Sequence, residues 1–173
     1  MILLETLYVA PPSLTAQAPV LAIIVPLLGA GAAALAPSGR TGWMISVVAA
    51  MFGAWMSLAV ACEVMRHGVV DYVLGGFDAP LGIALRIDAM GALIGLLINT
   101  VATLAAIFSG HSLVAEVRAE KHTLFQAGFL LCQAGLAGIV YTGDAFNAFV
   151  FLEISAIGTY SLIAAGERRD RRA

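Results

Sequence analysis

Five long apolar runs constrain the fold of this chain more than any other feature of its sequence. They cover residues 18–36, 42–65, 88–108, 123–141 and 144–165, within a residue or two. A helix needs about 20 mostly apolar residues to cross the hydrocarbon core of a bilayer, and each run comes close to that length. We therefore expect an all-α integral membrane protein with about five transmembrane helices, folded as a single membrane domain over residues 1–173.

The composition agrees with a membrane location and argues against several functional classes. Hydrophobic residues make up 61% of the chain and charged residues 12%, whereas a soluble domain is about half apolar and about a quarter charged. The net charge of −2, without a basic stripe, argues against a nucleic-acid partner. Cys62 and Cys132 lie in apolar runs, with no Cys or His at metal-ligand spacing. Because nucleotide and haem motifs are also lacking, we expect no metal and no cofactor.

Two connecting segments differ from the apolar runs. In the loop 68–87, between the second and third runs, VVDYVL and LGIALRI favour strands, and the turn-rich GGFDAP separates them. We expect this loop to be extramembrane and hairpin-like. Residues 109–122 (SGHSLVAEVRAEKH) have mixed charge and are expected to form a polar loop between the third and fourth helices.

The positions of lysine and arginine predict an orientation in the cell (inner) membrane. One set of loops holds Arg40, Arg118, Lys121, Arg168, Arg169, Arg171 and Arg172, and the other set holds Arg66 and Arg86. Because cytoplasmic loops carry the excess of basic residues, we expect the first set in the cytoplasm. The N-terminus is then outside and the C-terminus cytoplasmic, as an odd number of spans requires. The first residues lack a basic region, so no cleaved signal peptide is expected.

Glu153 is the residue in the apolar runs to which we assign a chemical role. It lies nine residues after Asp144, which is roughly 14 Å along a helix at ~1.5 Å per residue and about half of a hydrocarbon core. Burial in hydrocarbon disfavours an ionised carboxyl group, and intramembrane acids commonly mark proton paths. Glu153 is therefore the candidate catalytic residue, as a proton relay. The alternative is that its side chain only bonds a neighbouring helix.

Polar residues on neighbouring runs, and Tyr160 on the run of Glu153 itself, could assist Glu153 or could simply hold helices together. The neighbours are Asn99, Thr100 and Thr103 on the third run and Gln126 and Gln133 on the fourth. Tyr160 lies seven residues after Glu153, on the same helix face. Neutral polar side chains often bond across membrane helices without any further role. The chain has one lysine, Lys121, in a loop. A lysine that pairs with Glu153 inside the membrane must therefore come from another chain.

Three segments carry a resemblance to a known family. TGDAFNAFVFLEIS (142–155) resembles the fifth helix of the D-type membrane component of Mrp-type cation/proton antiporters, which is related to the L, M and N subunits of complex I. LGGFDAPLGI (74–83) with Asp88 resembles the loop before the third helix of that family, and RRDRRA (168–173) resembles the linker after its fifth helix. The resemblance covers an N-terminal portion of such a protein. It implies that Glu153 occupies the position of a glutamate that pairs with a lysine on the seventh helix.

The resemblance implies a membrane subunit of a multisubunit monovalent cation/proton antiporter that contributes to proton translocation. The chain lacks counterparts of the later lysines, so it is interpreted as a split subunit, a truncated frame or a short paralogue. Two alternatives stay open. One is a proton-pumping membrane-arm subunit of a respiratory NADH–quinone oxidoreductase or a membrane-bound hydrogenase, and the other is an assembly subunit without transport. The expected partners are other membrane subunits and the lipid bilayer.

Overall fold

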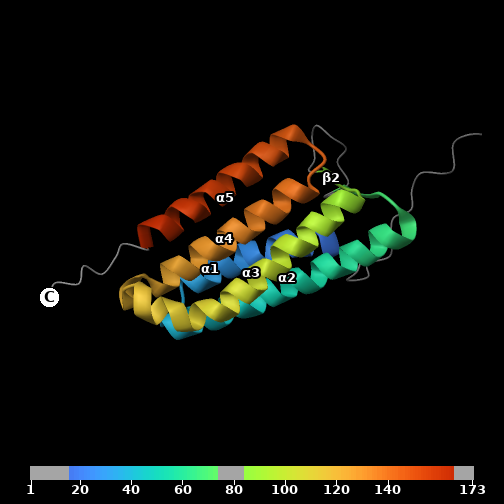
Figure 1. Cartoon of the computed structure of the whole chain (residues 1–173). Coiled ribbons are helices and arrows are strands. Elements are labelled where there is room, and N and C mark those ends of the chain that lie inside the picture. Colours follow the sequence, from blue (N-terminus) through green and yellow to red (C-terminus); the bar gives the residue numbers. More distant parts are fainter. Residues whose placement is uncertain (1–15, 74–83, 166–173) are drawn as a thin grey trace, which may run out of the picture.

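The structure is a computed structural model that describes residues 16–73 and 84–165. Most of this part of the chain lies in α1 (Ala18–Ala34), α2 (Gly39–His67), α3 (Ala89–Glu116), α4 (His122–Tyr141) and α5 (Ala145–Ala165). Two short strands, β1 (Val70–Val73) and β2 (Ala84–Ile87), lie between α2 and α3, and a 3₁₀-helix, η2 (Ala119–Lys121), precedes α4. Successive long helices run in opposite directions and form an elongated bundle (Figure 1).

The predicted all-α membrane fold is confirmed. Within the described residues, α2, α3, α4 and α5 are long and apolar enough to cross a membrane. The first helix, α1, is apolar but shorter, with 17 residues, and Pro26 lies inside it without ending it. In a helix the backbone polar groups bond within the segment, as a bilayer requires. The chain is therefore a multi-pass membrane protein.

Side-chain caps fix the starts of two helices. Ser38 Oγ accepts a hydrogen bond from Thr41 N at 3.2 Å, and α2 begins at Gly39, three residues before the predicted start. Asp88 Oδ1 accepts a hydrogen bond from Gly91 N at 2.7 Å at the start of α3. Short oxygen-bearing side chains at this position pair a backbone N–H that the first turn leaves free. The start of α2 was missed because Ser38 lies beyond the apolar run.

The third helix continues to Glu116, through half of the predicted polar loop 109–122. Ser109 Oγ donates a hydrogen bond to Ala106 O at 2.8 Å, so its hydroxyl proton is satisfied within the helix. Leu113 is buried in a small cluster with Val117 and Ala165 of α5. Tertiary packing therefore extends the helix beyond the apolar run, and the predicted end at residue 108 was too early.

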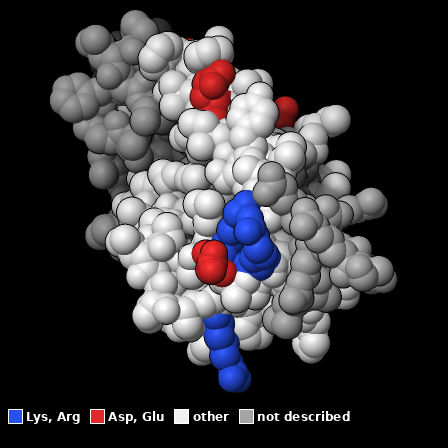
Figure 2. All heavy atoms as spheres, turned by 90° about the vertical axis from the view of Figure 1, so that its left-hand side faces the viewer, with Lys and Arg blue, Asp and Glu red and all other residues white. Residues whose placement is uncertain are grey.

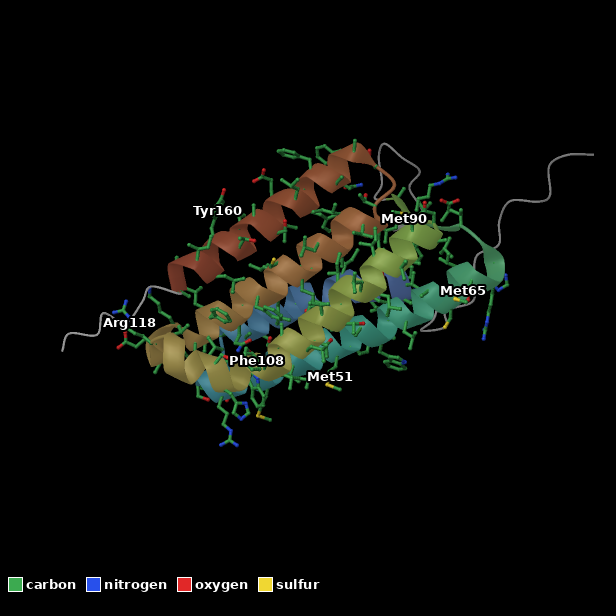
Figure 3. All side chains as sticks on the ribbon, viewed as in Figure 1. Met51, Met65, Met90, Phe108, Arg118 and Tyr160 are labelled. Atoms are coloured by element: carbon green, nitrogen blue, oxygen red, sulfur yellow. The ribbon has the colours of Figure 1, made fainter. Side chains whose placement is uncertain are left out.

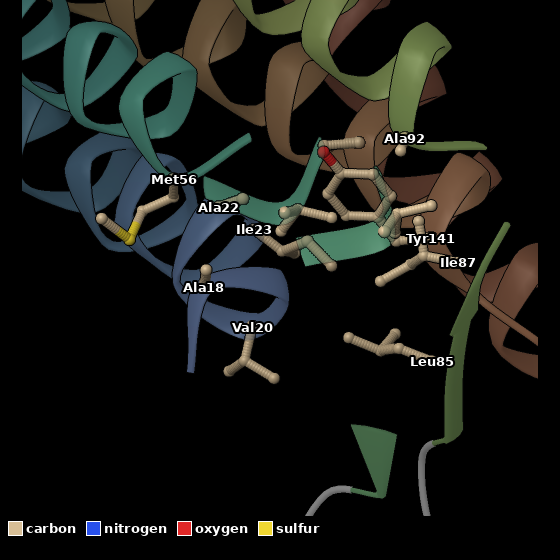
Figure 4. Packing of buried hydrophobic residues seen from close by; sticks show 12 residues of the cluster. Ala18, Val20, Ala22, Ile23, Met56, Leu85, Ile87, Ala92 and Tyr141 are labelled. Atoms are coloured by element: carbon tan, nitrogen blue, oxygen red, sulfur yellow. The ribbon is translucent and has the colours of Figure 1, made fainter. Parts of the chain in front are cut away.

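The fourth helix occupies the centre of the bundle. It packs against α1, α2, α3 and α5, whereas α5 packs principally on α4. Figure 1 shows α5 at the edge of the bundle, beside α4. The largest buried cluster joins α1, α2, α3, α4 and the strands, and Ile23, Ile87 and Ala92 lie around Tyr141 within it (Figure 4). The side of α5 turned away from α4 therefore faces outward.

The predicted hairpin is confirmed in its two arms. The strands β1 and β2 pair antiparallel from Val70 opposite Ile87 to Val73 opposite Ala84. The turn-rich residues between them belong to 74–83, which lie outside the described residues. Gly143 N donates a hydrogen bond to Ala84 O at 3.0 Å, so the second strand is attached to the turn between α4 and α5. The hairpin therefore closes the end of the bundle at which α5 begins.

Basic residues gather at the opposite end of the bundle, where α1 meets α2 and α3 meets α4. Among the described residues, Arg40, Arg118 and Lys121 lie there, next to Glu120. Figure 2 looks onto this end and shows blue side chains beside red ones. At the hairpin end, Arg86 and Asp71 form an ion pair with an N–O distance of 3.8 Å. Arg66, in the last turn of α2, also lies at the hairpin end, so the described residues place three Arg or Lys side chains at one end of the bundle and two at the other.

Candidate functional site: the outward face of α5

The start of α5 is fixed by its capping residue. Asp144 Oδ1 accepts a hydrogen bond from Phe146 N at 3.3 Å, and Asp144 Oδ2 accepts one from Asn147 Nδ2 at 3.2 Å. Thr142 Oγ1 accepts a hydrogen bond from Asp144 N at 3.4 Å. This turn also carries the contact with the second strand. The hairpin and the cap together set the point from which the helix rises.

Small residues bring α4 and α5 into backbone contact. A Cβ added to Gly135 would lie 2.6 Å from Ser155 N, and one added to Gly158 would lie 2.6 Å from Cys132 N. Larger side chains at these glycines would push the two helices apart. Membrane helices commonly use such residues to pack closely, because lipid offers no hydrophobic drive for association. The inward side of α5 is therefore defined by Ser155 and Gly158.

The far end of α5 is held by a loop residue. Lys121 Nζ, in η2, donates a hydrogen bond to Ala164 O at 2.9 Å. A cation at this position pairs with a carbonyl that the last turn leaves free and complements the negative end of the helix dipole. Both ends of α5 and its inward side are thus fixed by contacts within the chain.

Glu153 lies on the outward side of this fixed helix. It is the ninth residue of α5 and is exposed. At about 100° per residue, it projects roughly opposite to Ser155 and about 140° from Gly158. Phe149 and Ile157, one turn to either side of Glu153, and Tyr160, two turns beyond it, are exposed by 62%, 56% and 70%. Figure 3 shows Tyr160 pointing away from the bundle.

Within residues 16–73 and 84–165, no side chain or backbone group bonds to the carboxyl group of Glu153. An ionised carboxylate at the centre of a bilayer costs several kcal/mol unless water or a cation compensates it. Its immediate surroundings on α5 are apolar and aromatic, with Phe149 and Ile157 flanking it. The outward face of α5, defined here by Phe149, Glu153, Ile157 and Tyr160, therefore presents one carboxyl group, and the described part of the chain supplies no bonding partner for it.

The structure does not bring the predicted helper residues to Glu153. Gln126, Gln133 and Asn99 are buried between α2, α3 and α4 and bond to one another or to serines there. Thr103 Oγ1 bonds to Ala50 O on α2 at 3.0 Å. Among the described residues, Thr100 Oγ1 bonds only to Leu96 O of its own helix. For all of these residues except Thr100, the structure favours helix association, the alternative that the sequence left open. Tyr160 does share the face of Glu153, as its spacing predicted.

Sequence reasoning missed two members of the buried polar group. Ser57 on α2 accepts a hydrogen bond from Asn99 Nδ2 at 2.8 Å, and the hydroxyl of Tyr141 packs against Gly95. Gly53 lies one helical turn before Ser57, and Gly95 lies one turn before Asn99. These glycines were the sequence feature that could have indicated a closely packed interior at this point. A serine or tyrosine in an apolar run carries no such signal by itself.

Curated relatives share much of this sequence. The N subunit of the NADH-quinone oxidoreductase of Desulforudis audaxviator is 36% identical over 161 residues, which are 90% of this chain and 32% of that protein. The D-type component of the Na⁺/H⁺ antiporter of Alkalihalophilus pseudofirmus is 33% identical over 111 residues, which are 64% of this chain and 22% of that protein. The chain thus spans a third or less of the length of these relatives. No family model matches it.

Solved membrane complexes share the fold. A chain of the archaeal membrane-bound sulfane sulfur reductase, a respiratory membrane complex, superposes with a TM-score of 0.76 at 29% identity, covering 87% of this chain and 31% of that one. A chain of the Mrp complex from Dietzia sp. DQ12-45-1b superposes with a TM-score of 0.73 at 26% identity, covering 87% and 27%. The resemblance predicted from the sequence is therefore confirmed, and this chain is homologous, over about a third or less of their length, to the antiporter-like membrane subunits that include the D-type component of Na⁺/H⁺ antiporters and the N subunit of NADH-quinone oxidoreductase.

Proposed function

We propose that this protein contributes to proton translocation in a multisubunit monovalent cation/proton antiporter, as a membrane subunit or as part of one. Glu153 is the proton relay in this proposal. The proposal rests mainly on the position of its carboxyl group. This group lies half-way along α5 on an outward face, without a bonding partner in the described residues. The antiporter subunits among the relatives and the solved Mrp complex support the cation/proton assignment.

A carboxyl group in this position is suited to accept and release a proton. An ionised carboxylate at the centre of a bilayer needs a compensating cation or water. A nearby cation or water then decides which form is present. The contacts of α5 with α4 hold the carboxyl group at a fixed depth, so the proton would be passed at one defined point.

The outward face of α5 would be covered by a partner helix that supplies a lysine. A cation opposite Glu153 would compensate the ionised form, and the exposed aromatic residues around it would pack against that helix. The described chain supplies no such group. Its lysine, Lys121, bonds to Ala164 O at the far end of α5. The partner would be another membrane subunit of the same assembly.

The test is the substitution Glu153→Gln, which keeps the size and removes the titratable proton. In membrane vesicles that contain the whole assembly, we expect ion-linked proton transport to be abolished, with unchanged assembly. The matched control is Glu63→Gln. Glu63 lies near an end of α2, with its carboxyl group 3.7 Å from His67 Nε2, and its substitution should leave transport unchanged. Normal transport by the Glu153→Gln variant would contradict the assignment of Glu153 as a proton relay.

A second candidate is a proton-pumping subunit in the membrane arm of a respiratory complex. The similarity to the N subunit of NADH-quinone oxidoreductase and to a chain of the archaeal respiratory complex favours it specifically. The role of Glu153 would be the same, but proton movement would depend on electron transfer in other subunits. Copurification with iron–sulfur and flavin proteins would support this candidate. Proton transport driven by a cation gradient alone would support antiport.

The distribution of Lys and Arg over the whole sequence, with seven in one set of loops and two in the other, supports an orientation. We propose that the end of the bundle with Arg40, Arg118 and Lys121 faces the cytoplasm, because basic loops stay on that side. The N-terminus would then be outside and the C-terminus cytoplasmic. A cysteine at Glu120 should be labelled by an impermeant maleimide in inside-out vesicles, and a cysteine at Tyr72 should be labelled in intact cells. The reverse pattern would overturn this orientation.

A further inference from the structure

A chain of hydrogen bonds crosses the interior of α2, α3 and α4, away from the outward face of α5. Asn99 Nδ2 donates to Ser57 Oγ at 2.8 Å and to Gly95 O at 3.0 Å, and Gln133 Nε2 donates to Asn99 Oδ1 at 2.8 Å. These three polar side chains are all at least 98% buried. They lie at the middle of helices long enough to span a membrane.

The orientation of each amide in this chain is fixed by its neighbours. Gly95 O can only accept a hydrogen bond, so the Asn99 atom that faces it must be the amide nitrogen. Asn99 Oδ1 therefore faces Gln133 and accepts from Gln133 Nε2. It follows that Gln133 turns its carbonyl oxygen away from Asn99. Within the described residues, this buried oxygen has no hydrogen-bond partner.

The same reasoning applies to a second glutamine, two turns earlier on α4. Ser109 Oγ donates its proton to Ala106 O and must therefore accept from Gln126 Nε2, at 3.1 Å. Gln126 Oε1 is then left without a partner in the described residues, as is the hydroxyl of Ser46. Gln126 and Ser46 are both fully buried.

Helix register places Ser46 and Gln126 at the same depth. The second and fourth helices run in the same direction, with Gly42 against Thr123 and Gly53 against Gln133. Interpolation between these two contacts puts Ser46 level with Gln126. Two buried, unpaired polar groups from neighbouring helices therefore lie at one level of the bundle.

The hydroxyl group of Tyr141 lies beside the same buried polar side chains and has no hydrogen-bond partner in the described residues. It packs against Gly95, whose carbonyl oxygen holds Asn99, and it approaches Ser57 without reaching hydrogen-bond geometry. Gln133 and Tyr141 thus approach Asn99 and its bonded carbonyl from two directions. Apolar residues enclose the ring of Tyr141 (Figure 4), so its hydroxyl group has no access to outside water through that side.

We propose that the interior of α2, α3 and α4 binds ordered water at two sites. One site lies between Gln126 Oε1 and Ser46 Oγ, and the other is bounded by Gln133 Oε1 and the hydroxyl of Tyr141. A water molecule can donate to a carbonyl oxygen, and it can either donate to a hydroxyl group or accept from it. Buried water in proteins occupies such positions, with about three hydrogen bonds to otherwise unpaired groups. The two sites form a neutral, hydrated core that is distinct from the carboxyl group of Glu153.

The test is a density map of the protein in the assembly isolated from the membrane, at a resolution that shows ordered water. We expect isolated peaks within hydrogen-bond distance of Gln133 Oε1 and Tyr141 Oη, and of Gln126 Oε1 and Ser46 Oγ. Well-defined side chains with no peak between them would overturn the proposal. A peak that strengthens when sodium is replaced by thallium would also overturn it, because the site would then bind a cation.

A substitution makes the assignment specific. Tyr141→Phe removes one hydroxyl group, and the peak beside Gln133 should weaken or disappear while the peak between Ser46 and Gln126 persists. The matched control is Tyr72→Phe, which removes an exposed hydroxyl group bonded to Gln17 Oε1 at 3.1 Å. Both interior peaks should remain in that control. An unchanged peak in Tyr141→Phe would contradict the site at Tyr141.

Discussion

Two regions of the molecule differ in how their polar side chains are buried and bonded. They are the interior of α2, α3 and α4 and the outward face of α5. The interior holds buried neutral amides and hydroxyl groups, and its amide nitrogens bond from helix to helix. The outward face of α5 holds a single carboxyl group, exposed and without a bond to the described residues. Neutral groups can be satisfied within one chain at low cost, whereas a charge in a bilayer needs a compensating group. The difference indicates that the interior polar groups hold the helices together, whereas Glu153 interacts with a neighbouring subunit or with a transported proton.

The largest effect on stability is expected inside the bundle. Asn99→Ala removes the hydrogen bonds to Ser57 and Gly95 and leaves the amide of Gln133 buried without its acceptor. Removal of one buried partner costs roughly 1–3 kcal/mol in proteins. We expect a clearly lower midpoint when purified protein is unfolded by heat or by a denaturing detergent.

The neighbouring residue provides the control for this substitution. Thr100→Ala removes a hydroxyl group that is exposed and bonds only to Leu96 O of the same helix, so the midpoint should hardly change. If both variants unfold at the same midpoint, the chain of hydrogen bonds through Asn99 does not stabilise the bundle. The contrast between the interior and the outward face of α5 would then lose its energetic basis.

The comparison also shows what the sequence could predict. Apolar runs predicted the helices, because the length of a spanning helix is set by the bilayer. The strand-forming arms of the hairpin were predicted because Val and Tyr favour strands. Glu153 stood out because a charged residue is rare in such a run. Each of these features depends on local composition alone.

Other features depend on which helices become neighbours. The sequence could not show that Asn99 and Gln133 point into the interior of α2, α3 and α4, because both lie in apolar runs that also contain outward-facing residues. Glycines such as Gly53 and Gly158 determine which helix faces pack together, because backbones or polar side chains approach closely there. The extension of α3 to Glu116 also depends on neighbouring helices, because Leu113 packs in a cluster with Ala165 of α5.

The smallest effect on stability is expected from Glu153→Gln, although the same variant should abolish transport. In the described part of the chain its carboxyl group bonds to nothing, so its replacement by a neutral amide of similar size removes no contact. The unfolding midpoint of the purified protein should match that of the wild type within error. If it falls as far as in Asn99→Ala, Glu153 contributes to folding or assembly, and a structural role for α5 replaces the relay. A variant that is stable, assembled and inactive in transport separates the two regions, because each then affects only one of the two measurements.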